Sequence, residues 1–254
     1  MELKDSSILE KEYPEKMKIY LDFCKAAAEN DHIFKSFKHD KSYTFMLEHC
    51  PPKIGMNWLA KINSMMPFLL TDYPKVFDND KVGEPNMWQF TENLNCSPTT
   101  LQYLGVVLNL INRIGPLTGF SITEVGGGYG GQCKIIQDVF KIKSYVSIDM
   151  PEVIALQKKY LSTFDINNVT FLSNMSELKE TESDLFISNY ALSEVANPLQ
   201  NEYVKKFALP ARHGYITANG PIFLEVEIAE KYPETFMITP DEIGQRASNF
   251  IISW

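Results

Sequence analysis

The fold of this chain is decided by residues 122–132, which read I-T-E-V-G-G-G-Y-G-G-Q. The apolar run 120–125 predicts a strand, and the amphipathic pattern after the glycines predicts a helix. Glycines at such a junction let the backbone turn tightly and let a ligand approach the main chain, beside the free N–H groups of the helix N-terminus. The segment therefore predicts a nucleotide-like ligand, and the alternative is a purely structural turn.

Downstream of this turn, short apolar runs alternate with amphipathic segments, which is typical of a parallel sheet with crossover helices. A pair of apolar runs near the end of the sequence indicates a hairpin at the sheet edge. We therefore predict an α/β fold with a Rossmann-like, doubly wound, mostly parallel seven-stranded sheet. The expected strands are 120–125, 144–148, 169–172, 185–188, 214–218, 236–238 and 249–254.

Upstream of the turn, the sequence reads as helical. One face recurs through Met17–Ala28 and another through Trp58–Leu70, with Pro51-Pro52 between them. Residues 75–98 read as a loop, after which Ser97 and Pro98 predict the start of a further helix. We therefore divide the chain into a helical N-terminal region, 1–118, and a cofactor-binding domain, 119–254.

Composition excludes several classes of protein. The 254 residues carry a net charge of −8 and no long Lys/Arg run, so we expect no nucleic-acid partner. The four cysteines form no C-x-x-C pair, no apolar run resembles a signal peptide or a membrane span, and no P-loop or G-x-S-x-G motif occurs. We expect a cytoplasmic protein with reduced thiols and no membrane partner.

Polar residues follow three of the expected strands. Asp149 ends the second strand, where a carboxylate accepts hydrogen bonds from the ribose hydroxyls of a nucleoside; the alternative is a helix N-cap before Pro151. Ser173 and Asn174 follow the third strand, where they would meet an adenine or simply form a turn.

The fourth strand ends beside the point where doubly wound sheets bind ligands. Asn189 and Tyr190 would border the reactive end of the cofactor there. Glu194 follows about one turn later, either as a general base or as a solvated helix residue.

Three segments carry a resemblance to a known family: E-V-G-G-G-Y-G-G-Q-C-K, I-D-M-P-E-V-I-A-L-Q-K-K-Y-L and S-N-Y-A-L-S-E. From about Asn79 to Trp254, the chain resembles the sugar O-methyltransferase family of the class I superfamily. The resemblance implies S-adenosyl-L-methionine as the methyl donor and a sugar hydroxyl as the acceptor. The residues expected to bind the cofactor are Glu124, Gly126, Gly127, Gly128, Tyr129, Gly130, Gln132, Asp149, Met150, Ser173, Asn174, Asn189 and Tyr190.

Two alternatives remain open from the residues themselves. Gly126, Gly128 and Gly131 also satisfy the G-x-G-x-x-G pattern of an NAD(P)-dependent oxidoreductase, and an intact glycine loop is compatible with cofactor binding without turnover. Against the oxidoreductase, little sequence follows the fifth strand, and the closing strand pair is typical of methyltransferase sheets.

For a methyltransferase we expect direct SN2 transfer, assisted by a positioned base. Glu194 is the first candidate for that base and Glu225 the second. No acidic cluster follows the fourth strand, so we predict no metal. The partner would be a small-molecule or glycan acceptor covered by the N-terminal helices. The oligomeric state stays open, a homo-oligomer included.

Overall fold

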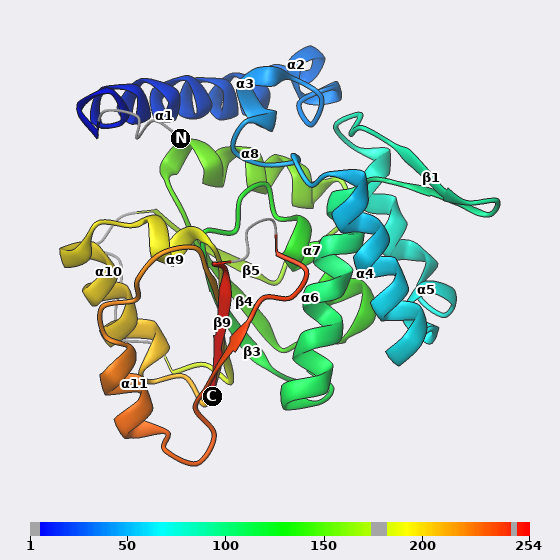
Figure 1. Ribbon diagram of the computed structural model, residues 1–254. Coiled ribbons are helices and arrows are strands. Elements are labelled where there is room, and N and C mark those ends of the chain that lie inside the picture. Colours follow the sequence, from blue (N-terminus) through cyan, green and yellow to red (C-terminus); the bar gives the residue numbers. More distant parts are fainter. Residues whose placement is uncertain (1–5, 174–181, 245–247) are drawn as a thin grey trace.

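A computed structural model of the chain describes residues 6–173, 182–244 and 248–254, with side chains described from Pro14 onward (Figure 1). Its main sheet has seven strands in the order β5-β4-β3-β6-β7-β9-β8, and β9 is antiparallel to both of its neighbours while the others pair in parallel. The prediction of a Rossmann-like, doubly wound sheet is confirmed. The strands are β3 (Ser121–Val125), β4 (Ser144–Ile148), β5 (Val169–Leu172), β6 (Leu185–Asn189), β7 (His213–Ala218), β8 (Met237–Pro240) and β9 (Phe250–Ser253).

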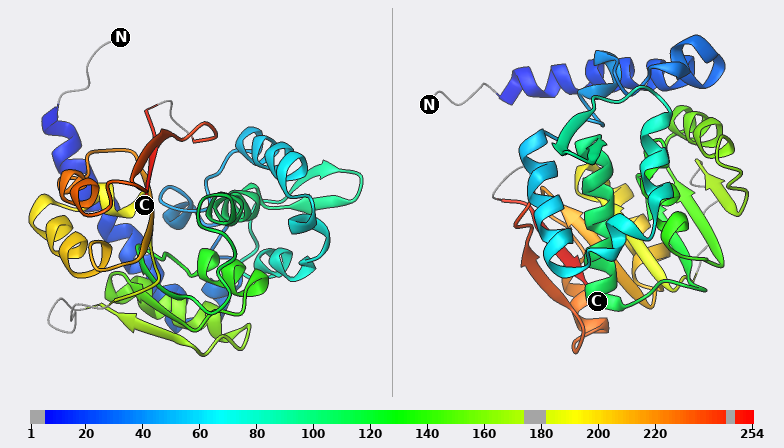
Figure 2. Two further views of the ribbon diagram at one scale, coloured as in Figure 1. Left: turned by 90° about the horizontal axis from the view of Figure 1, so that it is seen from below. Right: turned by 90° about the vertical axis from the view of Figure 1, so that its right-hand side faces the viewer.

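Helices cover both faces of this sheet because its central strands are buried on both sides. β3 has four buried residues in a row, and so does β6, which is the pattern of a parallel sheet between two helical layers. One face packs against α6 (Pro98–Ile114), α7 (Gly131–Val139) and α8 (Pro151–Ser162). The other packs against α10 (Asn197–Tyr203), the π-helical η3 (Val204–Ala208) and α11 (Glu225–Lys231), as the two views of Figure 2 show.

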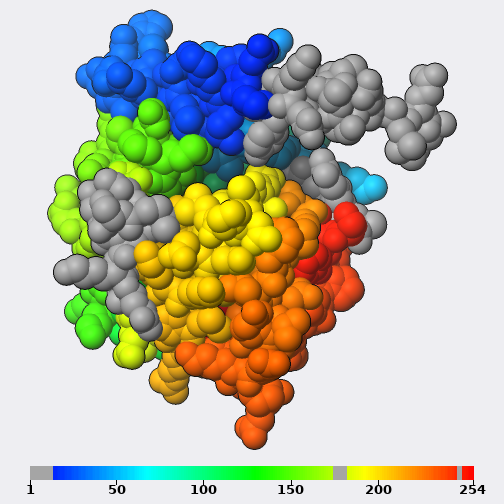
Figure 3. Space-filling model, turned by 90° about the vertical axis from the view of Figure 1, so that its left-hand side faces the viewer, coloured from blue at the N-terminus to red at the C-terminus, as the bar shows by residue number. Residues whose placement is uncertain are grey.

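The N-terminal helices form a cap over one end of this domain. α1 (Ser6–Glu29) packs on α8, and α4 (Pro52–Met65) packs on α6. In Figure 1, α1, α2 (Asp31–Lys35) and α3 (Lys41–Thr44) lie above α8, and Figure 3 shows the same blue segments resting on the green and yellow ones. The largest cluster of buried apolar residues includes both Tyr20 of α1 and Ile251 of β9. The cap and the sheet therefore share one core.

The carboxyl-terminal strands confirm the expected hairpin and add a feature to it. β9 inserts between β7 and β8, with Ile252 opposite both Ile216 and Ile238. Arg113 of α6 then joins the two hairpin strands, because its guanidinium donates to Ser253 Oγ at 2.9 Å and to Thr239 Oγ1 at 2.7 Å.

The expectation of a loop over residues 75–98 is wrong. The chain forms the 3₁₀ helix η1 (Pro74–Lys81) and the hairpin of β1 (Trp88–Thr91) and β2 (Leu94–Cys96). Strands of four and three residues give too few apolar positions for a period to be seen, and α5 (Phe68–Thr71) is equally short. The predicted start of α6 is confirmed, since Ser97 Oγ accepts from the Thr99 N–H at 3.1 Å and Pro98 opens the helix.

None of the helices in the described part of the chain combines the length and apolarity that crossing a membrane requires.

Candidate functional site

The glycine turn connects β3 to α7 at the carboxyl edge of the sheet. Gly126, Gly128 and Gly130 have φ angles of +81°, +55° and +95°, a region that side-chain-bearing residues rarely adopt. The Gly126 N–H donates to the Ile148 carbonyl at 2.9 Å, which ties the turn to the end of β4, and Gly130 is the N-cap of α7. The sequence therefore needs glycine at these three positions for the backbone itself.

Asp149, at the end of β4, holds the middle of the turn. Its Oδ2 accepts from the Gly128 N–H at 3.0 Å and its Oδ1 from the Met150 N–H at 2.8 Å. Burial raises the pKa of this carboxyl to about 6, and the two N–H groups oppose the rise. The alternative role as N-cap of α8 is not what the structure shows, since Met150 occupies that position.

A buried polar cluster lies beneath Gly127. Glu124 is 1% exposed and its Oε2 accepts from the Tyr145 hydroxyl at 2.8 Å. Burial raises the pKa of Glu124 to about 7, the Tyr145 hydrogen bond lowers it, and the charge of Asp149 raises it further. A Cβ on Gly127 would lie 2.5 Å from Gln157 Nε2 and 2.6 Å from Ser147 Oγ. Glu124 thus supports the turn from inside the domain.

Tyr129 and Gln132 also point into the protein. The Tyr129 side chain is fully buried, so any contact with a ligand at this position comes from its backbone. Gln132 is 2% exposed, its Nε2 donates to the Tyr103 carbonyl at 3.3 Å, and its Oε1 has no hydrogen-bond partner among the described residues.

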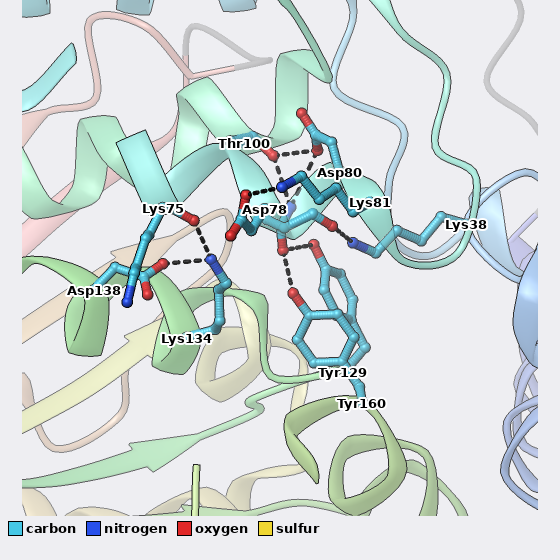
Figure 4. Close-up of polar contacts among 11 residues, drawn as sticks. Lys38, Lys75, Asp78, Asp80, Lys81, Thr100, Tyr129, Lys134, Asp138 and Tyr160 are labelled. Atoms are coloured by element: carbon cyan, nitrogen blue, oxygen red, sulfur yellow. Dashed lines mark hydrogen bonds and ion pairs between the residues drawn. The ribbon is translucent and has the colours of Figure 1, made fainter. Parts of the chain in front are cut away.

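Asn79 of η1 lies at the centre of a polar network that joins the cap to the glycine turn, and Figure 4 labels its partners Lys38, Thr100, Tyr129 and Tyr160. Its Oδ1 accepts from the Tyr160 hydroxyl at 2.6 Å and lies 3.2 Å from the Tyr129 hydroxyl oxygen, while its carbonyl accepts from Lys38 Nζ at 2.7 Å. Lys38 Nζ also lies 4.2 Å from the centre of the Tyr129 ring. Burial lowers the pKa of Lys38 to about 8, and Glu48 and Asp80 oppose the fall.

Neighbouring ion pairs extend this network along α7. Lys134 pairs with Asp138 and donates to the Lys75 carbonyl, and Lys81 pairs with Asp78 at 2.7 Å (Figure 4). Of these contacts, the bond from Lys134 to the Lys75 carbonyl joins η1 to α7, the helix that begins at the glycine turn.

The chain between α3 and α4 crosses the edge of the sheet on the glycine side. Leu47 Cδ1 lies 2.8 Å from the place of a Cβ on Gly128, and Glu48 Oε1 accepts from the Tyr129 hydroxyl at 2.6 Å. Glu48 has φ +59°, a strained conformation for this residue. The cap therefore touches the glycine turn directly.

A second strained residue lies at the end of β6, beside the point where the strand order reverses. Tyr190 has φ +66°; its N–H donates to the Thr217 carbonyl at 2.7 Å and its hydroxyl to Asp241 Oδ2 at 3.0 Å. Asn189 Oδ1 accepts from Thr217 Oγ1 at 3.2 Å, whereas Asn189 Nδ2 has no partner among the described residues. Glu194, the last residue of α9 (Ala191–Glu194), is exposed, and its Oε1 accepts from Asn219 Nδ2 at 2.8 Å.

The remaining predicted residues fall into three groups. Met150 precedes α8 beside Asp149, and Ser173 is exposed after β5, at the same edge of the sheet. Asn174 lies outside the described residues. Glu225 opens α11, whose Lys231 and the adjoining Tyr232 bond to the Leu209 carbonyl in the outer helical layer, and its role as the second candidate base stays a prediction.

A hollow of about 210 Å³ opens beside the segment that crosses the edge. Its rim includes exposed apolar side chains, Trp88 at 49% and Met87 at 44% exposed. Polar groups share the wall with them. The lining residues are Glu48, His49, Cys50, Pro52, Asn86, Met87, Trp88, Ser97 and Pro98.

Sequence reasoning expected the N-terminal helices to cover the acceptor, but it did not identify which residues of the cap lie at this site. Leu47, Glu48, His49 and Trp88 all belong to the region 1–118, and their motifs carry no local signal, because their partners are distant in the sequence. The one feature visible in the sequence, an isolated histidine in a helical region, does not distinguish a functional residue from a surface residue. In the described part of the chain, no group of three or more His, Cys, Asp or Glu is arranged to hold a metal ion.

No protein-family model matches the chain, and no curated protein matches it. Solved structures of similar fold include a SAM-dependent methyltransferase from Aquifex aeolicus, with 17% identity over 57% of this chain and 87% of that one and a TM-score of 0.42. The methyltransferase domain of bacterial CtHen1 has 11% identity over 60% and 96%, with a TM-score of 0.45. A precorrin-6y C5,15-methyltransferase from Geobacter metallireducens has 11% identity over 59% and 87%, with a TM-score of 0.39. At these identities the likeness describes the fold, and the proposals below rest on the chain's own residues.

Proposed function

We propose that this protein is an S-adenosyl-L-methionine-dependent O-methyltransferase whose acceptor is a sugar or glycan hydroxyl. The observation that carries the proposal is the bond between Asp149 and the Gly128 N–H at the carboxyl edge of the sheet. It places an acidic side chain and a glycine turn together where doubly wound sheets bind nucleoside ligands.

The residues present fit such a cofactor. Each oxygen of Asp149 accepts one backbone N–H and keeps further lone-pair capacity, which suits the two hydroxyls of a ribose. Asn189 Nδ2 is buried with its hydrogen-bond capacity unused by the described residues, and it lies on the strand next to the turn. When bound, the cofactor supplies a methyl group already activated on a sulfonium.

The chain's own contribution to transfer would be alignment, exclusion of water and proton removal. The chain between α3 and α4 lies against Gly128 through Leu47. A cofactor on the glycine turn would therefore be shielded from solvent on that side. Glu194, on the short helix after β6, is the carboxylate at this edge that we propose takes part in proton removal.

The hollow beside the cap segment supports a sugar as the acceptor. Trp88 offers an exposed aromatic face, while Glu48, Asn86 and Ser97 offer polar atoms in the same wall. A sugar ring has an apolar face and a polar rim, and a cleft of this mixed lining matches both.

Calorimetry with S-adenosylhomocysteine and with NADH tests the cofactor assignment. We expect S-adenosylhomocysteine to bind and to raise Tm, because a ligand that binds only the folded state stabilises that state. Asp149→Ala should lose this binding while keeping its fold. Binding of NADH in place of S-adenosylhomocysteine would establish the oxidoreductase alternative instead.

A further inference from the structure

We propose that His49, which lines the hollow beside the glycine turn, is the catalytic base that takes the proton from the acceptor hydroxyl, with Glu194 as the carboxylate that stabilises the charge then formed on its imidazole. This inference rests on the proposed methyl transfer and identifies the residue of that site that handles the proton. It shifts direct proton acceptance from Glu194 to a side chain of the cap.

The backbone holds His49 close to the glycine turn. The two residues before it both contact that turn, Leu47 against Gly128 and Glu48 through the Tyr129 hydroxyl. Two such contacts, together with the strained φ of +59° at Glu48, leave the next residue little freedom. Strain of this kind is maintained only where surrounding contacts enforce it, and here it turns the chain from the buried Glu48 to the exposed His49.

His49 lies between the proposed acceptor subsite and the end of β6, where Glu194 lies. Its side chain lines the hollow that also contains Trp88, the proposed acceptor subsite. On the other side, the carboxylate of Glu194 is near enough to act on the imidazole electrostatically. Glu194 is itself held by Asn219 at 2.8 Å, so it approaches from the edge where β6 ends.

The charges around His49 suit a base rather than an acid. The surrounding protein atoms desolvate the imidazolium and lower the pKa of His49, although the residue as a whole is exposed. The Leu47 carbonyl and the Glu194 carboxylate oppose this shift in pKa. The imidazole is therefore neutral at neutral pH, and the carboxylate stabilises the imidazolium that forms when a proton arrives.

The step is balanced without a further reagent. The acceptor oxygen forms a bond to the methyl carbon while the carbon–sulfur bond breaks and its electron pair stays on sulfur. The hydroxyl proton passes to an imidazole nitrogen of His49 and then to solvent through the open hollow. The products are the methyl ether, S-adenosylhomocysteine and one released proton.

Activity of His49→Ala is the first test, with methyl-labelled S-adenosyl-L-methionine and a panel of UDP-glucose, GDP-mannose and methyl glycosides. We expect kcat to fall by about 10²–10⁴-fold, the usual contribution of general-base catalysis, with unchanged binding of S-adenosylhomocysteine. Added imidazole should restore part of the rate to His49→Ala. His39→Ala, an exposed histidine of the same region, is the matched control and should match the wild type.

The outcomes separate the two proposals. Transfer by His49→Ala at the wild-type rate would overturn the role of His49 and leave the methyltransferase assignment standing. A wild type that binds S-adenosylhomocysteine but methylates no member of the panel would overturn the sugar-hydroxyl proposal and this inference together. Absence of that binding would overturn the proposed function at its first step.

A readout independent of turnover tests the pairing with Glu194. The pKa of His49, measured by NMR titration of its imidazole, should lie below that of a solvated histidine and should fall further in Glu194→Gln, which keeps the shape but removes the charge. In the wild type, kcat/KM should decline as pH falls through this pKa, and the decline should move to lower pH in Glu194→Gln. An unchanged His49 pKa in Glu194→Gln would overturn the pairing.

Discussion

Glu48 and Tyr129 lie 81 positions apart in the sequence, and the tyrosine hydroxyl donates to the glutamate Oε1 at 2.6 Å. The bond is buried and joins the cap to the glycine turn, since Tyr129 lies between Gly128 and Gly130. Burial raises the pKa of Glu48, while Lys38 and this hydrogen bond lower it. The cap is thereby connected to the turn through a polar contact that water does not reach.

Tyr129→Phe should lower the free energy of unfolding by about 1–3 kcal/mol, because it removes the donor from a buried carboxylate. Tyr43→Phe is the matched control. Tyr43 is as buried as Tyr129 and packs against the Tyr129 ring, but its hydroxyl has no hydrogen-bond partner among the described residues. Urea denaturation should therefore show Tyr43→Phe to be as stable as the wild type or more so. Equal losses in both variants would mean that the Glu48 contact contributes nothing to stability.

Asp149 should make cofactor binding depend on pH. Its folded-state pKa of about 6 lies above the ordinary 3.8, so the carboxylate becomes protonated as pH falls through 6 and one oxygen ceases to accept. We expect the Kd for S-adenosylhomocysteine to rise by about tenfold per pH unit below that point. Calorimetry between pH 5 and 8 measures this, and Asp149→Asn, which has no charge to lose, should bind weakly with no such slope. A wild-type Kd that stays constant across the range would remove Asp149 from the ribose site.

Gly128→Val should abolish binding of S-adenosylhomocysteine. A side chain here is strained at φ +55°, and its Cβ would meet Leu47 at 2.8 Å. The double variant Gly128→Val with Leu47→Ala separates two causes, because it returns the space on the cap side. If the ligand must approach the main chain at Gly128, the double variant recovers only the part of Tm lost to the Leu47 clash, because the strain at φ +55° remains, and it does not recover binding. Recovery of both would show that the glycine only makes room for the cap.

Ionisation of Glu124 should lower the free energy of unfolding as pH rises. Its folded-state pKa of about 7 lies above the ordinary 4.5, so the folded protein favours the protonated form and the stability contributed by Glu124 is lost between about pH 4.5 and 7. The corresponding loss is about 3 kcal/mol. Unfolding free energies at pH 5 and 8 should therefore differ more in the wild type than in Glu124→Gln, whose amide oxygen still accepts from Tyr145. The exposed Glu92→Gln serves as a control and should keep the wild-type difference.

The sheet could be predicted from the sequence because its signals are local. Each parallel strand is a short apolar run next to a turn or a helix start, and β4 and β5 have the predicted bounds. The glycine turn and Asp149 are likewise recognisable from spacing along a single strand–helix–strand unit. The hairpin of β1 and β2 was missed because strands so short have no visible period.

The cap side of the site could not be predicted in this way. The contacts of Leu47 and Glu48 with the turn depend on how α1 and α4 pack, and no spacing rule connects residues so far apart. His49 carries no local motif, and only its neighbours in space give it a context. The backbone strain at Glu48 and Tyr190 could not be predicted either. Glutamate and tyrosine do not favour a positive φ, so the strain depends on the folded backbone.

The insertion of β9 between β7 and β8 has a consequence for synthesis on the ribosome. A chain that emerges in order exposes β8 before β9, and among the described strands β8 pairs with β9 alone. During that interval the free side of β7 is also an open strand edge, which is a site where a second nascent chain can pair. The sheet closes only when residues 250–253 have left the exit tunnel, so these four residues complete a sheet whose five parallel strands lie within residues 121–218.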